Sequence, residues 1–132
     1  MHRLVAEARV GRLATAGAGG IHLVPFCYVL ADGWLYSAVD GKAKRGTALR
    51  RVSNLRGNPA ASVLVDHYDE DWQALWWVRM EATGTVIDGL EGAEPSLALL
   101  RRKYPQYASV ALGPPVIALR VTRWTGWSAR PL

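Results

Sequence analysis

Apolar and polar residues alternate along several short stretches of this chain, which is the pattern of half-buried β-strands. We expect strands over residues 10–15, 21–30, 34–39, 61–67, 74–88 and 116–124. Glycine-containing turns at 17–20 and 31–33 would join the first three strands into an antiparallel meander. The sequence therefore predicts a sheet built mainly from neighbouring hairpins.

Three stretches predict short helices, over residues 1–9, over the segment that ends at Asn58-Pro59, and over residues 95–104. In the second helix Leu49, Val52 and Leu55 recur at three-residue spacing, which gives the helix one apolar side. Strands and helices do not alternate regularly, so a doubly wound sheet is not expected. We predict a mainly β (α+β) fold, a closed or split barrel of about six antiparallel strands with short flanking helices, because closure removes exposed edges.

The 132 residues are enough for one hydrophobic core, so we expect one domain over residues 1–132. No apolar run approaches the roughly 20 residues of a membrane helix, and the N-terminal stretch has no apolar core of a secretory signal. Cys27 is the only cysteine, which excludes an internal disulfide. We expect a cytoplasmic protein without a membrane partner.

The net charge of +5 and the pI near 9.8 favour an anionic partner, which could be nucleic acid, a phosphorylated cofactor or an acidic substrate. The strongest basic segment is YSAVDGKAKRGTALRRVSNLRGNP, residues 36–59. It runs from a strand end through a glycine turn into a helix, so its cations and the helix N-terminus meet at one place. Such an arrangement holds the phosphate of a small cofactor, although a solvated basic helix has the same composition.

Other kinds of site find little support. His2, His22 and His67 lie far apart and show no zinc-site spacing, so we expect no metal. The phosphate-loop, dinucleotide-binding and serine-hydrolase motifs do not occur. A nucleic-acid partner is not expected, because no aromatic platform occupies adjacent strand positions.

Acidic and aromatic residues gather in DHYDEDW, residues 66–72, and the following LWWVR. The carboxylates could line a solvated loop or border a substrate pocket. Trp76 and Trp77 point to opposite faces of a strand, so at most one belongs to the core and the other could lie at a subunit interface. In RWTGW, residues 123–127, a ring-shaped cofactor could lean on one tryptophan, for which Trp127 is the candidate.

Several blocks together carry a family resemblance: VGRLATAGAGGIHLVPFCYVLADGWLYSAVDGK, the K-x-K-R-x-x-x-L-R-R-x-x-N-L-x-x-N-P run, SVLVDHYDEDWQALWWVRMEATGTV, LLRRKYPQY and RWTGWSA. Nearly end to end, the chain resembles the pyridoxamine 5′-phosphate oxidase-related split β-barrel proteins of the FMN-binding type. More narrowly, it resembles the actinobacterial branch that is thought to use the deazaflavin coenzyme F420.

The resemblance implies a homodimer with a flavin-like ring at the interface between two barrels. It places the ring beside the backbone of the strand near residue 25, the ribityl chain at the next strand end, and the phosphate on the basic residues that follow. The implied positions are Val24, Pro25, Phe26, Ser37, Ala38, Lys42, Lys44 and Arg45, with Arg51 and Asn54 at matching helix positions.

The resemblance further implies an oxidoreductase that transfers a hydride to a small organic acceptor. Flavin-using oxidases of the family carry adjacent Arg and Lys after the strand, whereas here Ala43 separates Lys42 from Lys44. This departure favours coenzyme F420 over FMN, the alternative cofactor. A second alternative is a non-catalytic protein that binds F420 or haem. The catalytic residues stay unassigned, with His67 and Tyr68 as the candidates if an acid–base group exists.

Overall fold

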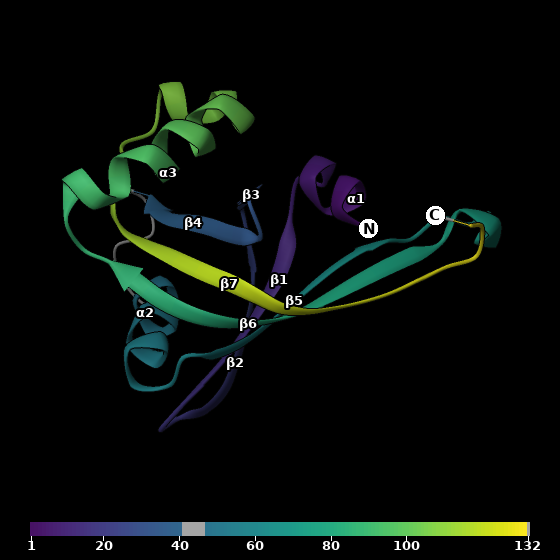
Figure 1. Cartoon of the computed structure of the whole chain (residues 1–132), viewed down its shortest axis with the longest axis horizontal. Helices are drawn as coiled ribbons and strands as arrows, with labels where there is room; N and C mark the ends of the chain where they lie inside the picture. The colour runs from purple at the N-terminus through teal and green to yellow at the C-terminus, as the bar shows by residue number, and fades with distance from the viewer. Residues whose placement is uncertain (41–46, 132) are drawn as a thin grey trace.

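The computed structural model describes residues 1–40 and 47–131 and consists of one curled, seven-stranded antiparallel sheet with helices on its faces (Figure 1). The strands are β1 (Gly11–Gly17), β2 (Gly20–Phe26), β3 (Val29–Ala31), β4 (Trp34–Asp40), β5 (Ala60–His67), β6 (Trp76–Ile87) and β7 (Leu112–Ser128). The helices are α1 (His2–Glu7), α2 (Thr47–Gly57) and α3 (Leu90–Lys103), with single 3-10 turns η1 (Trp72–Ala74) and η2 (Pro105–Ala108).

The sheet order is β2-β1-β5-β6-β7-β4-β3, so the prediction of one strand over residues 21–30 is wrong. The chain leaves β2 after Phe26 and begins β3 at Val29, at the opposite edge of the sheet. The predicted three-stranded meander is therefore two separate hairpins. The predicted mainly β split barrel is confirmed, with seven strands rather than six among the described residues.

Side chains rather than a strand ladder hold the crossing between β2 and β3. The wholly buried Tyr28 donates its hydroxyl to the Val5 carbonyl at 2.5 Å, and its own amide donates to the Tyr104 hydroxyl at 3.2 Å. Lys103 donates to the Tyr28 carbonyl at 2.9 Å, with its ammonium 4.1 Å from the centre of the Tyr28 ring. Burial, reinforced by the charge of Arg9, lowers the pKa of Lys103 to about 8. These contacts provide hydrogen-bond partners for the backbone amide and carbonyl of Tyr28, which do not pair with a neighbouring strand.

The inner face of the curled sheet carries the main core, which α2 closes on one side. Val52 and Leu55 of α2 are buried in this core, so the predicted apolar side of the helix is confirmed at both positions. A Cβ atom on Gly84 of β6 would lie 2.8 Å from the end of the Leu55 side chain, so the close approach of helix and strand favours glycine there.

Helix α3 covers the outer face of the β3–β4–β7 half of the sheet, beside β4 in Figure 1. It begins at Leu90, earlier than predicted, and Pro95 lies inside it rather than near its start. Ala93, Leu97 and Leu100 are wholly buried against the sheet. Their packing holds the first turns in place despite the backbone hydrogen bond that proline cannot make.

The last strand is also longer than predicted. It begins at Leu112 rather than at residue 116 and therefore includes the Gly113–Pro115 stretch. The pairing with β4 jumps from Val116 to Gly113, so the two prolines between them lie in a bulge where no ladder hydrogen bond is needed.

No helix among the described residues has the length and apolar character required to cross a membrane.

Candidate functional site

A cleft of about 360 Å³ lies where the two hairpins separate, and it gathers residues that are distant in sequence. Its lining comes from β2 and the residue after it, β4, α2, η2 and the residue before β1: Val10, Pro25, Phe26, Cys27, Ser37, Ala38, Arg51 and Tyr107. Five predicted cofactor positions therefore share one cleft: Pro25, Phe26, Ser37, Ala38 and Arg51.

Ser37 is the most informative residue of the cleft. Its side chain is on the inner face of β4, opposite the apolar Ile117 of β7, and the residue is only 3% exposed. Its hydroxyl makes no hydrogen bond with any described residue, although it borders the cleft. A cleft-lining hydroxyl that bonds no other described residue can hydrogen-bond a polar group of a ligand, and Ser37 is suited to this role.

Positive charge lies on one side of the cleft. Arg51 of α2 lines the cleft, and its neighbour Arg50 donates to the Gly19 carbonyl at 3.1 Å, which ties the helix to the β1–β2 turn. The positive charges of both guanidinium groups lower the pKa of His22, a residue of β2. This arrangement favours an anionic group near the start of α2.

His22 was not among the predicted site residues. It is 7% exposed, and neither ring nitrogen has a hydrogen-bond partner. Burial, followed by the charges of Arg50 and Arg51, lowers the pKa of His22. The only sequence signal was its position on the same face of the strand as Phe26, four residues later.

Lys42, Lys44 and Arg45, the predicted phosphate-binding residues, lie outside the residues that the structure describes.

Three other predicted residues do not line the cleft. Asn54 is buried, and its side-chain amide donates to the Thr15 hydroxyl at 3.1 Å, so it joins α2 to β1. Val24 is half-buried against the main core, two residues from the cleft wall. Trp127 is near the end of β7, and that end of the strand lies at the opposite end of the long axis from α3 and β4 (Figure 1).

Trp127 belongs to a second cleft, of about 380 Å³, on the β5–β6–β7 end of the sheet. The lining is mostly aromatic and apolar: Leu64, Asp66, His67, Tyr68, Leu75, Trp76, Trp77, Arg79 and Trp127. Trp77 pairs with Asp66 on one side and with Trp127 on the other, so these three residues form one row across the sheet. Trp76 packs partly against the main core, as expected for only one of the two adjacent tryptophans.

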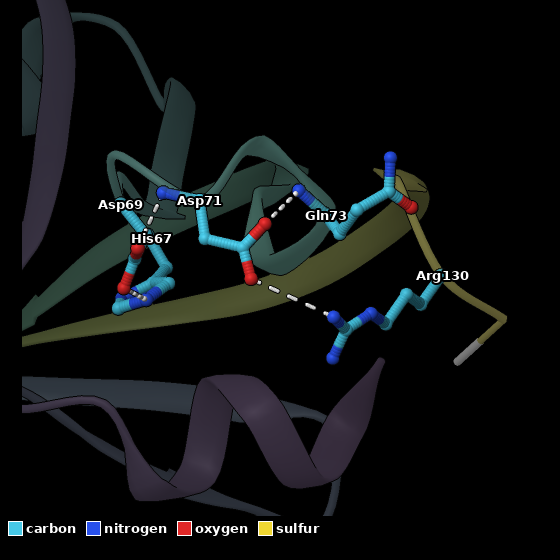
Figure 2. Close-up of polar contacts among 5 residues, drawn as sticks. All are labelled: His67, Asp69, Asp71, Gln73 and Arg130. Atoms are coloured by element: carbon cyan, nitrogen blue, oxygen red, sulfur yellow. Dashed lines mark hydrogen bonds and ion pairs between the residues drawn. The ribbon is translucent and has the colours of Figure 1, made fainter.

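The acidic loop borders this second cleft, and its carboxylates bind neighbouring protein groups (Figure 2). Asp71 accepts a hydrogen bond from the Gln73 amide at 3.1 Å and lies 3.6 Å from the Arg130 guanidinium. Asp69 accepts from the Asp71 amide at 2.7 Å and lies 3.8 Å from His67. The described residues contain no cluster of three or more side chains that could hold a metal ion. These contacts give the loop a defined shape.

Together, the curled antiparallel sheet, its separated hairpins and the cleft between them define a split-barrel protein of the flavin-binding type. Residues 1–126 match the model of the pyridoxamine 5′-phosphate oxidase family, and the chain belongs to that family. The family-level resemblance drawn from the sequence is thereby confirmed. No functionally curated protein matches the sequence.

Solved structures of low sequence identity share the fold. A conserved hypothetical protein from Mycobacterium tuberculosis is 24% identical, with a TM-score of 0.72, and the match covers 97% of this chain and 82% of that chain. An FAD-binding protein from Mesorhizobium loti is 21% identical, with a TM-score of 0.68 and coverages of 95% and 87%. The heme storage protein of Vibrio cholerae is 14% identical, with a TM-score of 0.71 and coverages of 96% and 90%.

Proposed function

We propose that this protein is a cytoplasmic oxidoreductase that binds coenzyme F420 at a homodimer interface and uses it to reduce a small organic acceptor. The observation that carries the proposal is the cleft in which Pro25, Phe26, Ser37, Ala38 and Arg51 meet, because the family resemblance assigned these positions to one cofactor. The one-domain organisation stays a prediction from the length.

The chemistry of the cleft fits the middle and tail of such a cofactor. The buried Ser37 hydroxyl would bind a polar oxygen of the ribityl chain or phosphate, and Arg51 would supply a charge-assisted contact to the phosphate. Lys42, Lys44 and Arg45 are proposed to complete the phosphate site. Pro25 and Phe26 would provide an apolar wall and backbone groups beside the ring.

The position of Trp127 supports the proposed dimer. Trp127 lies in the second cleft, which shares no lining residue with the cofactor cleft. We therefore do not expect one subunit to place both clefts against the same cofactor ring. If Trp127 also contacts the ring, it would come from the second subunit.

The outer face of the sheet offers a surface for such a dimer. Ile21 is 82% exposed and Leu23 66% exposed on the edge strand β2. A shallow cleft of about 320 Å³ beside them is lined mainly by alanines of β1, β5 and β6. Leu64 and Trp127 extend the exposed apolar surface towards the second cleft. Large exposed apolar side chains of this kind are typical of an interface.

When bound, the deazaflavin would supply a hydride. The chain would orient the cofactor, exclude water from its ring and neutralise its anionic tail. His67 and Tyr68 border the second cleft and remain the candidates for a proton donor to the product, with no acid–base step assigned to either.

A side-by-side titration with coenzyme F420 and FMN tests the cofactor assignment. We expect quenching of tryptophan fluorescence by F420 at micromolar concentration and weaker binding of FMN. The reverse order of affinities would favour the flavin alternative. An FAD-binding protein that shares the fold is the reason to test it. Absence of quenching by either compound would contradict the proposal.

Steady turnover then separates an enzyme from a cofactor carrier. Reduced F420 should be oxidised in the presence of enones or quinones at a rate proportional to protein concentration. Binding without turnover would favour the non-catalytic alternative. The heme storage protein among the fold relatives makes haem the second ligand to titrate.

A further inference from the structure

A further, half-open cavity lies between α3 and the β3–β4 hairpin. It has a volume of about 440 Å³, within the usual range of small-molecule sites. The lining residues are Ala31, Asp32, Trp34, Tyr36, Ile87, Gly92, Pro95, Ser96 and Leu99. None of them lines the proposed cofactor cleft or the Trp127 cleft.

Two aromatic rings form one wall of this cavity. Trp34 and Tyr36 are two residues apart on β4, so they share one face of the strand. Their ring centres are 6.2 Å apart, and the ring planes differ by 11°. Both side chains are only half-buried, and both line the cavity. The face of an indole or phenol ring carries negative electrostatic potential.

A carboxylate lies at the same cavity. Asp32 occupies the turn between β3 and β4 with φ 50°, and among the described residues it has no ion-pair partner. On and before α3, Glu94 pairs with Arg101 and Asp88 pairs with Arg56, while Glu91 is not among the residues that line the cavity. The carboxylate of Asp32 is therefore available to a ligand.

Polar groups of the other walls do not compete for this role. Ser96 is buried, and its hydroxyl donates to the Ala93 carbonyl at 2.7 Å within α3. Arg120 is the β7 neighbour of Trp34 but is not among the lining residues. The cavity thus combines aromatic faces, apolar walls and one unpaired carboxylate in a protein whose net charge is +5.

We propose that the cavity between α3 and the β3–β4 hairpin binds a small organic cation, a quaternary ammonium or a protonated amine. The apolar body of the ligand lies against the Trp34 and Tyr36 rings, and its positive charge faces Asp32. Cation–π attraction and the carboxylate act on the same charge, so the site selects cations over neutral molecules of equal shape. This inference does not depend on the proposed cofactor function.

Calorimetric titration of the full chain with choline and with its neutral carbon isostere dimethylbutanol tests the proposal. The two compounds have nearly the same shape and differ in charge. We expect choline to bind roughly tenfold more tightly, as expected for one cation–π contact assisted by a carboxylate. Equal affinities, or no binding of either compound, would overturn the proposal.

Two variants locate the binding. Asp32→Asn should remove most of the preference for choline without disturbing the turn, because asparagine readily adopts a positive φ. Trp34→Leu should weaken choline binding, with circular dichroism as the check that the sheet is intact. Trp72→Leu, an exposed tryptophan of η1, is the matched control and should bind choline normally. Unchanged choline binding in Asp32→Asn would show that the cavity is not the site.

Discussion

The side-chain amide of Asn54 in α2 donates a hydrogen bond to the hydroxyl of Thr15 in β1 at 3.1 Å, and both residues are buried. The resemblance had assigned Asn54 to the cofactor site, whereas its contact serves to fasten the helix to the sheet. Only one helix turn away, Arg51 does line the cofactor cleft. One face of α2 therefore holds the fold together, and a neighbouring position contributes to the site.

This contact predicts a loss of stability without a loss of ligand binding. Asn54→Ala should lower the free energy of unfolding by about 1–3 kcal/mol, because it leaves the buried Thr15 hydroxyl without a partner. Urea denaturation measures the change, and Thr15→Val with the double variant gives the coupling energy. A large fall in cofactor affinity for Asn54→Ala, with unchanged stability, would return Asn54 to the binding site.

Ser37, in contrast to Asn54, should contribute to cofactor binding rather than to stability. Ser37→Ala removes a cleft-lining hydroxyl that bonds no other described residue, so we expect little change in stability. If the hydroxyl binds the cofactor, affinity should fall by about 1 kcal/mol, which is several-fold in Kd. Ser53→Ala, an exposed serine of α2, serves as the control in the same fluorescence titration. Equal cofactor affinity for the two variants would argue against the role of Ser37.

The lysines before α2 give a third prediction. Replacing Lys42 and Lys44 together with alanine should weaken cofactor binding by a few kcal/mol, about the contribution of two charge-assisted hydrogen bonds. The circular dichroism spectrum should not change. Fluorescence titration against the unmodified protein measures the loss, and the same titration at higher salt should show a smaller difference. An unaltered Kd would move the phosphate site elsewhere.

His22 predicts how stability depends on pH. Its pKa in the folded protein is below the ordinary value of 6.5, because of burial and the charges of Arg50 and Arg51. The unfolded chain therefore binds more protons than the folded protein as the pH falls through 6.5 towards the folded-state pKa. The free energy of unfolding should fall as the pH is lowered through this window and should recover when the pH is raised again.

Denaturation at several pH values between about 5 and 8 measures the effect of His22. His22→Leu should flatten the profile in this range, since the replacement cannot take up a proton. His67→Gln changes an exposed histidine and should leave the slope unchanged. A slope that persists in the His22 variant would assign the effect to other groups.

The proposed dimer depends on the outer face of the sheet. Leu23→Glu places a charge on exposed apolar surface and should shift the protein from dimer to monomer in light scattering. Leu90→Glu is the control, because Leu90 is similarly exposed at the start of α3, away from that face. A monomeric unmodified protein, or two variants that both stay dimeric, would contradict this interface.

The local pattern of the chain predicted much of the secondary structure. Alternation predicted the strands near β1, β4, β5 and β6, and the Asp32-Gly33 turn has the positive φ angles that such a hairpin requires. The pattern failed where long-range contacts decide. The buried Tyr28 lies between β2 and β3, where the chain crosses from one edge of the sheet to the other, and buried packing carries α3 past Pro95.

For the candidate site, the sequence predicted the types of residue: a basic segment, a serine on a strand and a row of aromatics. It assigned Pro25, Phe26, Ser37, Ala38 and Arg51 to one site through the resemblance, and the structure brings these five residues together. Three features depend on the folded structure: Asn54 bonds Thr15, Trp127 lies in a different cleft, and the ring nitrogens of His22 are buried without hydrogen-bond partners. The physical reason is that strand order and helix docking determine which side chains meet, and both depend on contacts between residues far apart in the sequence.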